Sequence, residues 1–331
     1  MLFTMQRTES TFDEIPVIDL SNASSPDPAQ RLALAEKIRD ACVNVTNHGI
    51  PERYVIDALE AVKPFFALPT PSKMEFDIHK STNFKGYTKI LGEKTDPNGK
   101  GPGDLHEGFD IGWEQLDQQS FSSRDDGEMS GSNVWPDLPG FKEAVLTYYH
   151  AVVQLGLKLF PLFALALDLP ENFFEDKTTK PAAIMRLLHY PPQPPVIVDD
   201  DGSGIGIGAH TDYECFTILW QDNVSALQVQ TTEGKWIDAV PIPGTFVLNI
   251  GDQLARWTND VFKSTVHRAI NKSGLERYSI PLFYGVDYDV PLTPIASCIS
   301  SDMPAKYEVI TAGEYVRHRL QETYAHSGTN P

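Results

Sequence analysis

The sequence predicts a mainly β protein with flanking α-helices, in which a jelly-roll core is buttressed by N-terminal helices. From residue 182 onward, short apolar strands recur with turn residues between them. Eight or so strands of this kind are typical of a double-sheet jelly roll. Before that point helical patterns dominate, and no linker separates the two parts. We therefore expect a helical and strand region, residues 1–180, packed on a core, residues 181–331, as one integrated unit.

The N-terminal region opens with a short apolar strand pattern over residues 15–20. A helix should begin after Asp27, because this capping residue is followed by a proline at the first helical position. The buried stripe of that helix is expected to contain Leu34, Ile38, Ala41 and Cys42.

Three further helices are predicted. One covers residues 52–66, and a short one near the end of the chain covers residues 313–324. The longest covers residues 140–169 and is apolar nearly all round in its second half, so we expect it to be buried behind a sheet. Pro161 should kink this helix or mark a junction in it.

The β pattern of the second half has recognisable strands and turns. The clearest strands are expected at residues 216–220, 226–230, 236–240 and 244–250. Turn residues, such as Glu233-Gly234 and Pro243-Gly244, separate them.

Two histidines and an aspartate form the most informative pattern in the chain. His210 and Asp212 are spaced i, i+2, so on a strand their side chains leave the same face. His267 follows from a separate strand and would complete a face of two histidines and one carboxylate on a metal ion. Such a site, with positions left open, suits non-heme Fe(II) and O2 chemistry. Zinc also accepts these ligands, so a hydrolase is an alternative.

A second polar pair follows shortly after His267. Arg277 and Ser279 are again spaced i, i+2 in a strand pattern. A guanidinium fork next to a hydroxyl group suits a carboxylate. We therefore expect an anion site beside the metal site.

These residues, with the motifs around them, resemble the iron(II)/2-oxoglutarate-dependent dioxygenases of the isopenicillin N synthase-like family, in its bacterial and fungal form. The resemblance extends nearly from end to end of the chain. Its motifs lie at residues 15–20, 46–51, 86–87, 107–112, 186–192, 249–252, 257–260 and 277–281.

The resemblance implies a double-stranded β-helix that holds Fe(II) through His210, Asp212 and His267. It also implies that Arg277 and Ser279 grip the distal carboxylate of 2-oxoglutarate, and that the Tyr190 hydroxyl group binds the same co-substrate. The implied reaction uses O2 to hydroxylate or desaturate a small organic molecule, with release of succinate and CO2. The pathway implied is one of secondary or specialised metabolism.

The sequence departs from the family pattern in two places. Leu188 stands where many relatives have asparagine, which removes one polar contact to 2-oxoglutarate. The chain also passes directly from the first helix to the strand before residue 46, so that strand is shortened or the helix unwinds early.

Four side chains are candidates for the substrate cavity. Arg186 shares strand parity with Tyr190, so it faces the cavity or is a buried charge paired with an acid; we favour the cavity. Phe109, Tyr213 and Phe283 are expected to contact the substrate, with a purely structural role as the alternative.

Composition limits the partners. The formal net charge of −18 argues against a nucleic-acid or anionic-membrane partner, because both need a basic surface. The three cysteines lack metal or disulfide spacing, and Cys215 is expected to pack away from the metal ligands. No basic start with an apolar stretch and no run of 18 apolar residues is present. We therefore expect a soluble cytoplasmic protein that binds a small-molecule substrate and has no obligatory protein partner.

Two alternatives within the same fold remain open at this stage. An iron(II) oxidase that does not use 2-oxoglutarate would employ Arg277 and Ser279 to hold a substrate carboxylate instead. A catalytically silent small-molecule-binding protein would have no need of an intact metal triad.

Overall fold

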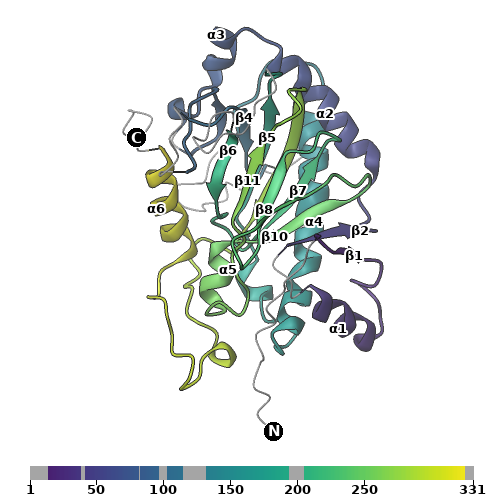
Figure 1. Cartoon of the computed structure of the whole chain (residues 1–331), viewed down its shortest axis with the longest axis vertical. Helices are drawn as coiled ribbons and strands as arrows, with labels where there is room; N and C mark the ends of the chain where they lie inside the picture. Colours follow the sequence, from purple (N-terminus) through teal and green to yellow (C-terminus); the bar gives the residue numbers. More distant parts are fainter. Residues whose placement is uncertain are drawn as a thin grey trace.

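Two β-sheets and a layer of helices build the protein (Figure 1). The computed structural model describes residues 14–38, 42–81, 83–96, 103–114, 132–193 and 205–324. Within them the larger sheet has eight strands in the order β1-β2-β10-β7-β12-β5-β4-β3, and the smaller has four in the order β6-β11-β8-β9. This arrangement confirms the predicted mainly β jelly roll with flanking helices.

Strands from both halves of the chain share the larger sheet. It contains β1 (Val17–Asp19), β2 (Cys42–Thr46), β3 (Gly86–Thr88), β4 (Glu107–Ile111), β5 (Ala183–Tyr190), β7 (Phe216–Gln221), β10 (Phe246–Ile250) and β12 (Arg277–Tyr284). The smaller sheet contains β6 (Ile205–His210), β8 (Leu227–Gln230), β9 (Trp236–Asp238) and β11 (His267–Ile270). β1 runs parallel to β2, whereas the other paired strands are antiparallel.

The helices are α1 (Pro28–Lys37), α2 (Glu52–Phe66), α3 (Thr70–Lys73), α4 (Phe141–Ala166), α5 (Asp252–Trp257) and α6 (Ala312–Tyr324). The bounds of α2 match the prediction, and those of α4 and α6 differ from it by a few residues. α1 begins as predicted, with the Asp27 carboxylate accepting a hydrogen bond from the Ala29 backbone at 2.9 Å.

The predicted end of α1 was wrong. The helix ends at Lys37, and Cys42 lies in β2 rather than on the helical stripe. Strand pairing accounts for the difference, because Cys42 lies opposite Asn249 of β10. Leu34 and Ile38 are buried as expected, whereas Ala41 lies outside the described residues.

Alternation along the strands of the larger sheet separates two environments. On β12, Arg277, Ser279, Pro281 and Phe283 line a pocket on one face. Tyr278, Ile280, Leu282 and Tyr284 belong to the main hydrophobic core on the other face. The helices therefore cover one side of the sheet, while the other side is left for a cavity.

The long helix α4 forms much of that core. It is long and apolar enough to cross a membrane, but 61% of its most apolar window is buried inside the fold, as in the core helix of a globular protein. It is one continuous helix through Pro161, so the junction offered as one of two alternatives there is absent. At Gly156 it approaches β12 so closely that a Cβ would lie 2.3 Å from the Tyr284 ring.

Candidate metal centre and adjoining pockets

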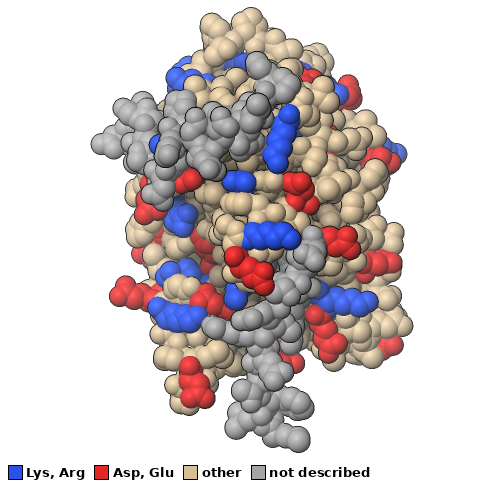
Figure 2. All heavy atoms as spheres, viewed as in Figure 1, with Lys and Arg blue, Asp and Glu red and all other residues tan. Residues whose placement is uncertain are grey.

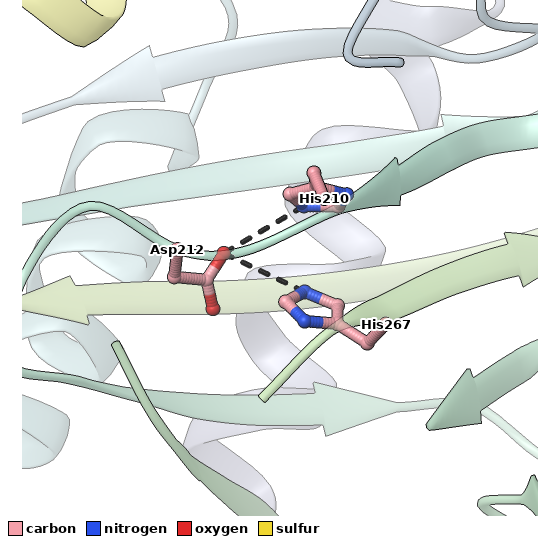
Figure 3. A group of neighbouring side chains, drawn as sticks. All are labelled: His210, Asp212 and His267. Atoms are coloured by element: carbon pink, nitrogen blue, oxygen red, sulfur yellow. Dashed lines mark ion pairs between the residues drawn. The ribbon is translucent and has the colours of Figure 1, made fainter. Parts of the chain in front are cut away.

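His210, Asp212 and His267 converge on one point between the two sheets (Figure 3). His210 ends β6 and His267 begins β11, and the two residues lie opposite each other in the antiparallel pair. Asp212 lies just past the end of β6 rather than on it. Its Oδ1 atom is 3.7 Å from His210 Nε2 and 3.5 Å from His267 Nε2. The predicted triad is therefore brought together, although strand alternation alone does not place Asp212.

Neighbouring groups orient each of the three side chains. His210 Nδ1 lies 2.8 Å from the Gly208 carbonyl oxygen, and His267 Nδ1 lies 2.9 Å from that of Thr265. A proton on each Nδ1 leaves the Nε2 lone pair directed at the shared point.

Asp212 is held in a comparable way. Its Oδ2 atom accepts hydrogen bonds from Thr217 Oγ1 at 2.5 Å and from Asn249 Nδ2 at 2.7 Å. The other oxygen, Oδ1, faces the two histidines. Sequence reasoning did not single out Thr217 or Asn249 as orienting groups, although Asn249 lies within a motif of the resemblance.

Burial and mutual charge shape the protonation of the triad. Burial and the neighbouring His267 lower the pKa of His210 to about 4. Burial alone would raise the pKa of Asp212, but the two imidazoles and Thr217 outweigh it and hold this pKa well below its ordinary value. The ionised carboxylate raises the pKa of His267 against the opposing effect of burial. A metal ion would displace that proton.

The donor set fits Fe(II). Two imidazole nitrogens and one carboxylate oxygen lie within 4.8 Å of one another, each with its other polar atom already hydrogen-bonded. Three protein ligands on one side leave the remaining coordination positions for other molecules.

The first adjoining pocket, here called the Arg277 pocket, lies between the sheets next to the triad. Arg277 is 1% exposed, so its guanidinium group is buried. Its hydrogen bonds go to the Val224 carbonyl oxygen at 3.2 Å, Ser279 Oγ at 3.3 Å and Gln221 Oε1 at 3.3 Å. None of these partners is an acid.

Tyr190 and Leu188 form further walls of the Arg277 pocket. Both residues line the pocket, and the Tyr190 ring lies over the Arg277 guanidinium at 4.6 Å. His189, with opposite strand parity, instead bonds to Glu107 at 2.7 Å and stacks on Tyr278, as expected of a structural residue. Cys215 is buried in the main core, as predicted.

The second adjoining pocket, here called the Glu214 pocket, shares His210 and Asp212 with the first. Tyr213 lines it, and Phe283 lines both pockets, as predicted. Its remaining walls include acidic side chains and apolar residues of α6: Glu93, Asp110, Glu214, Val316 and Leu320. The sequence did not indicate that α6 lines this pocket, because residues 212 and 316 are far apart in the chain and no local pattern connects them.

Arg186 combines the two roles predicted as alternatives. Its side chain lines both pockets and also pairs with two buried acids. Nη1 and Nη2 donate to Glu93 at 3.1 and 2.5 Å, and Nε donates to Asp110 at 2.8 Å. Burial would raise the pKa of Glu93, but Arg186 and His106 together outweigh it and hold this pKa well below its ordinary value.

The prediction that Phe109 contacts the substrate was wrong. Phe109 lines neither pocket, and its ring packs against Phe65 and Phe141 in the main core. Adjacent residues of a strand point to opposite faces, so Asp110 rather than Phe109 reaches the cavity.

Comparisons with known proteins agree with this geometry. Residues 181–286 match the family model of the 2OG-Fe(II) oxygenase superfamily. Residues 15–138 match the model of the N-terminal region of non-haem dioxygenases in morphine synthesis.

The chain is similar along nearly its whole length to curated relatives. It is 37% identical over 320 residues to the 2-oxoglutarate-Fe(II) type oxidoreductase hxnY of Emericella nidulans, covering 93% of this chain and 90% of that one. It is 35% identical to the homoarginine-6-hydroxylase 2-ODD-C23.1 of Arabidopsis thaliana, covering 87% and 89% of the two chains.

Solved structures show the same architecture. A full-length Neurospora crassa protein in complex with alpha-KG and thymine is 29% identical, with a TM-score of 0.80 and coverage of 93% of this chain and 96% of that one. Together with the family models and the curated relatives, this likeness identifies the family. The chain belongs to the 2OG-Fe(II) oxygenase superfamily: it is an oxidoreductase that uses Fe(II), with 2-oxoglutarate and O2 as co-substrates.

Proposed function

We propose that His210, Asp212 and His267 hold the iron, that the Arg277 pocket binds 2-oxoglutarate and that the Glu214 pocket binds a small organic substrate. The substrate is hydroxylated or desaturated, in secondary or specialised metabolism. We place the enzyme in the cytoplasm as one integrated unit, without a nucleic-acid, membrane or obligatory protein partner. Lys and Arg are scattered singly among Asp and Glu on the face in Figure 2, which accords with this proposal.

The observation that carries the co-substrate site is the buried charge of Arg277. A guanidinium group that is 1% exposed is costly to bury unless an anion pairs with it. Among the described residues Arg277 forms no ion pair, and its hydrogen-bond partners are neutral oxygen atoms. The distal carboxylate of 2-oxoglutarate would supply the missing charge in a bidentate pair with Arg277, with Ser279 as a further donor.

The division of labour between the residues follows from their positions. The iron, when bound, supplies the oxidising chemistry with O2 while 2-oxoglutarate leaves as succinate and CO2. Arg277, Ser279 and Tyr190 fix one end of the co-substrate, so that its keto-acid end reaches the triad. Apolar walls at Leu188 and Val229 keep water from the reacting groups.

The second pocket suits a small substrate. It borders His210 and Asp212 directly, and its cavity volume of about 100 Å³ limits the substrate to a small molecule. Relatives named for homoarginine and a structure with thymine support a small nitrogen-containing molecule as the kind of substrate.

Replacement of Arg277 tests the co-substrate site. In Arg277→Met the concentration of 2-oxoglutarate needed for half-maximal succinate release should rise at least about a hundredfold, because one partner of a buried pair is lost at a cost of roughly 3–5 kcal/mol. Arg277→Lys should recover part of the loss, since an ammonium group cannot reproduce the planar fork. Fe(II) binding should change little in either variant.

Two results would contradict the assignment. An unchanged 2-oxoglutarate requirement in Arg277→Met would remove Arg277 from the site. Substrate oxidation in the wild type without 2-oxoglutarate, together with weaker substrate binding in the variant, would favour the oxidase alternative. Arg53→Met, at an exposed residue of α2, is the matched control and should behave as the wild type.

A further inference from the structure

The acid–base balance of the Glu214 pocket differs from that of the Arg277 pocket. Its charged lining residues outside the metal triad are Glu93, Asp110, Glu214 and Arg186 among the described residues. Three are acids and one is a base. The pocket thus carries more carboxyl groups than cations.

Arg186, the arginine among these lining residues, already forms ion pairs within the protein. Arg186 forms a bidentate pair with Glu93, whose side chain is 1% exposed, and a further bond with Asp110, whose side chain is 7% exposed. His106 also approaches Glu93, with 3.3 Å between Nε2 and Oε2. An anionic group on the substrate would have to compete with two buried carboxylates for Arg186, which makes an anionic substrate unfavourable.

Within the described ranges, Glu214 is a buried acid with one unpaired oxygen atom, whereas Arg277 is a buried base without an acidic partner. The residue is 3% exposed, and its Oε2 atom is buried without a hydrogen-bond partner in the described part of the chain. Buried polar atoms are almost always hydrogen-bonded, so an unpaired carboxyl oxygen in a pocket indicates that a donor comes from elsewhere. Burial raises the pKa of the Glu214 carboxyl group to about 8, so a nearby cation is needed to keep this group ionised at neutral pH.

Strand geometry places this oxygen at the pocket. Gly285 directly follows β12, which ends at Tyr284, and its backbone keeps the strand pairing by donating to the Ala182 carbonyl oxygen at 2.7 Å. Residues two apart on a strand share a face, so Gly285 and Phe283 face the same side. A Cβ on Gly285 would lie 2.1 Å from Glu214 Oε2, which places the carboxyl group against that face, where Phe283 lines the pocket.

Other parts of the pocket wall are apolar. They include Ile184 and Phe283 from the sheet and Val316 and Leu320 from α6. A ligand that fits therefore has a hydrocarbon body and a polar end that donates hydrogen bonds.

We propose that the substrate presents a cationic nitrogen group, an ammonium or a guanidinium, to the carboxyl group of Glu214, and that this contact selects the substrate class. The inference rests on the proposed use of the Glu214 pocket for the substrate. Glu214 is two residues beyond Asp212, so a group held by its carboxyl is fixed relative to the metal centre. The carbon to be oxidised then belongs to the hydrocarbon part of the same molecule.

A set of matched probes tests the substrate class. Butylammonium, butylguanidinium, neutral butyramide and anionic valerate are titrated by calorimetry into the full chain loaded with Mn(II), with and without 2-oxoglutarate. The cations should bind roughly tenfold to a hundredfold more tightly than butyramide, as expected for a hydrogen bond to a charged group. Valerate should bind most weakly in the Glu214 pocket.

Two variants locate the contact. Glu214→Gln keeps the size of the side chain but removes its charge, and should abolish the preference for the cations. Gly285→Ala keeps the carboxyl group but forces it to move, because the new Cβ would lie 2.1 Å from Oε2, and should weaken cation binding as well. Glu60→Gln, at an exposed acid of α2, is the control and should keep the preference.

Several results would overturn the inference. Butyramide binding as tightly as the cations would mean that Oε2 is satisfied by water, and tighter binding of valerate would exclude a cationic substrate. A cation preference that survives in Glu214→Gln would remove Glu214 from recognition. The binding of 2-oxoglutarate is measured in the same samples, so failure of the co-substrate site is distinguished from failure of the substrate class.

Discussion

At the scale of single residues, His210 and His267 are oriented for a metal by the backbone alone. Each Nδ1 lies within 3 Å of a carbonyl oxygen two residues earlier in the chain, Gly208 for His210 and Thr265 for His267. Asp212 receives its orientation from two side chains, Thr217 and Asn249. The three side chains are therefore preorganised, so an ion bound here would not need to rearrange them.

Removal of one ligand should greatly weaken metal binding. His267→Ala leaves one histidine and one carboxylate, and no other His, Cys, Asp or Glu among the described residues completes the group. Affinity for Fe(II) should fall by at least about a hundredfold, since even the loss of an outer partner costs about 10- to 100-fold. Anaerobic calorimetric titration measures this change. His79→Ala, on a solvent-exposed turn, is the control, and unchanged affinity in His267→Ala would refute the ligand assignment.

Arg186 illustrates how pairing alters the expected outcome of a substitution. Arg186→Leu leaves the buried carboxylates of Glu93 and Asp110 without their cation, so we expect a loss of roughly 3–5 kcal/mol in the free energy of unfolding. Chemical denaturation measures it, with Arg53→Leu on the exposed face of α2 as the control. A variant that is as stable as the wild type but cannot use substrate would show that Arg186 acts mainly in recognition.

The same pair has a pH signature. Arg186 and His106 hold the pKa of Glu93 well below its ordinary value of 4.5, which is its value in the unfolded chain. The stabilisation is therefore fully present above about pH 4.5 and is lost as the pH falls towards the lower folded-state pKa. In Arg186→Leu this contribution should become clearly smaller, and a stability profile measured from about pH 3 to about pH 7 should show the difference. An identical acid profile in variant and wild type would contradict the pairing.

At the scale of elements, the strands of the larger sheet divide the residues between chemistry and core. Alternate residues of β12 and β5 line the Arg277 pocket, and the intervening ones pack against the helices. The helix layer thereby fixes the plane of the sheet that carries Arg277 and Ser279. Where α4 packs on β12, Gly156 lies directly against the Tyr284 ring.

Gly156→Ala should be destabilising in spite of its better helix propensity. Alanine gains up to about 1 kcal/mol over glycine in a helix. Its Cβ would lie 2.3 Å from the Tyr284 ring, which is fully buried and stacks on Phe216 at 5.3 Å. Overpacking of this kind costs about 1–3 kcal/mol, so the net change should lower the free energy of unfolding by up to about 2 kcal/mol.

Thermal denaturation measures that change. Gln154→Ala, at an exposed position of the same helix, is the matched control and should leave the melting temperature nearly unchanged. A higher melting temperature in Gly156→Ala would mean that the Tyr284 ring moves without cost.

At the scale of the whole molecule, the candidate residues for binding iron and 2-oxoglutarate lie between the two sheets. The triad draws two of its members from the smaller sheet, whereas Arg277 and Ser279 belong to the larger one. Iron and 2-oxoglutarate together would therefore bridge the two sheets. Ligands that bind the folded state alone stabilise it by mass action.

Ligand addition should raise the melting temperature in two separable steps. At about 100 times its dissociation constant, each of Mn(II) and 2-oxoglutarate should stabilise the wild type by about 2.7 kcal/mol. In Arg277→Met the increment from Mn(II) should remain and that from 2-oxoglutarate should be nearly lost. Scanning calorimetry with each ligand alone and with both gives the two increments. An equal 2-oxoglutarate increment in variant and wild type would contradict the proposed pocket.

The sequence by itself determined the family, the jelly-roll class, the approximate bounds of α2, α4 and α6, and the candidate residues for the metal centre and the Arg277 pocket. These depend on local patterns: strand alternation, capping, and short motifs such as His210-x-Asp212. It also indicated that Arg277, Ser279 and Tyr190 face the same cavity, because side chains alternate strictly along a strand.

Tertiary structure alone decided which neighbours each of these residues meets. Strand pairing ended α1 early and placed Cys42 in β2, and alternation on β4 brought Asp110 rather than Phe109 to the cavity. The pairing of Arg186 with Glu93 and the unpaired Glu214 oxygen depend on residues far apart in the chain. Local patterns determine which way a side chain faces, but only the packing of distant segments determines what it faces, because that choice is made by the burial of the whole core.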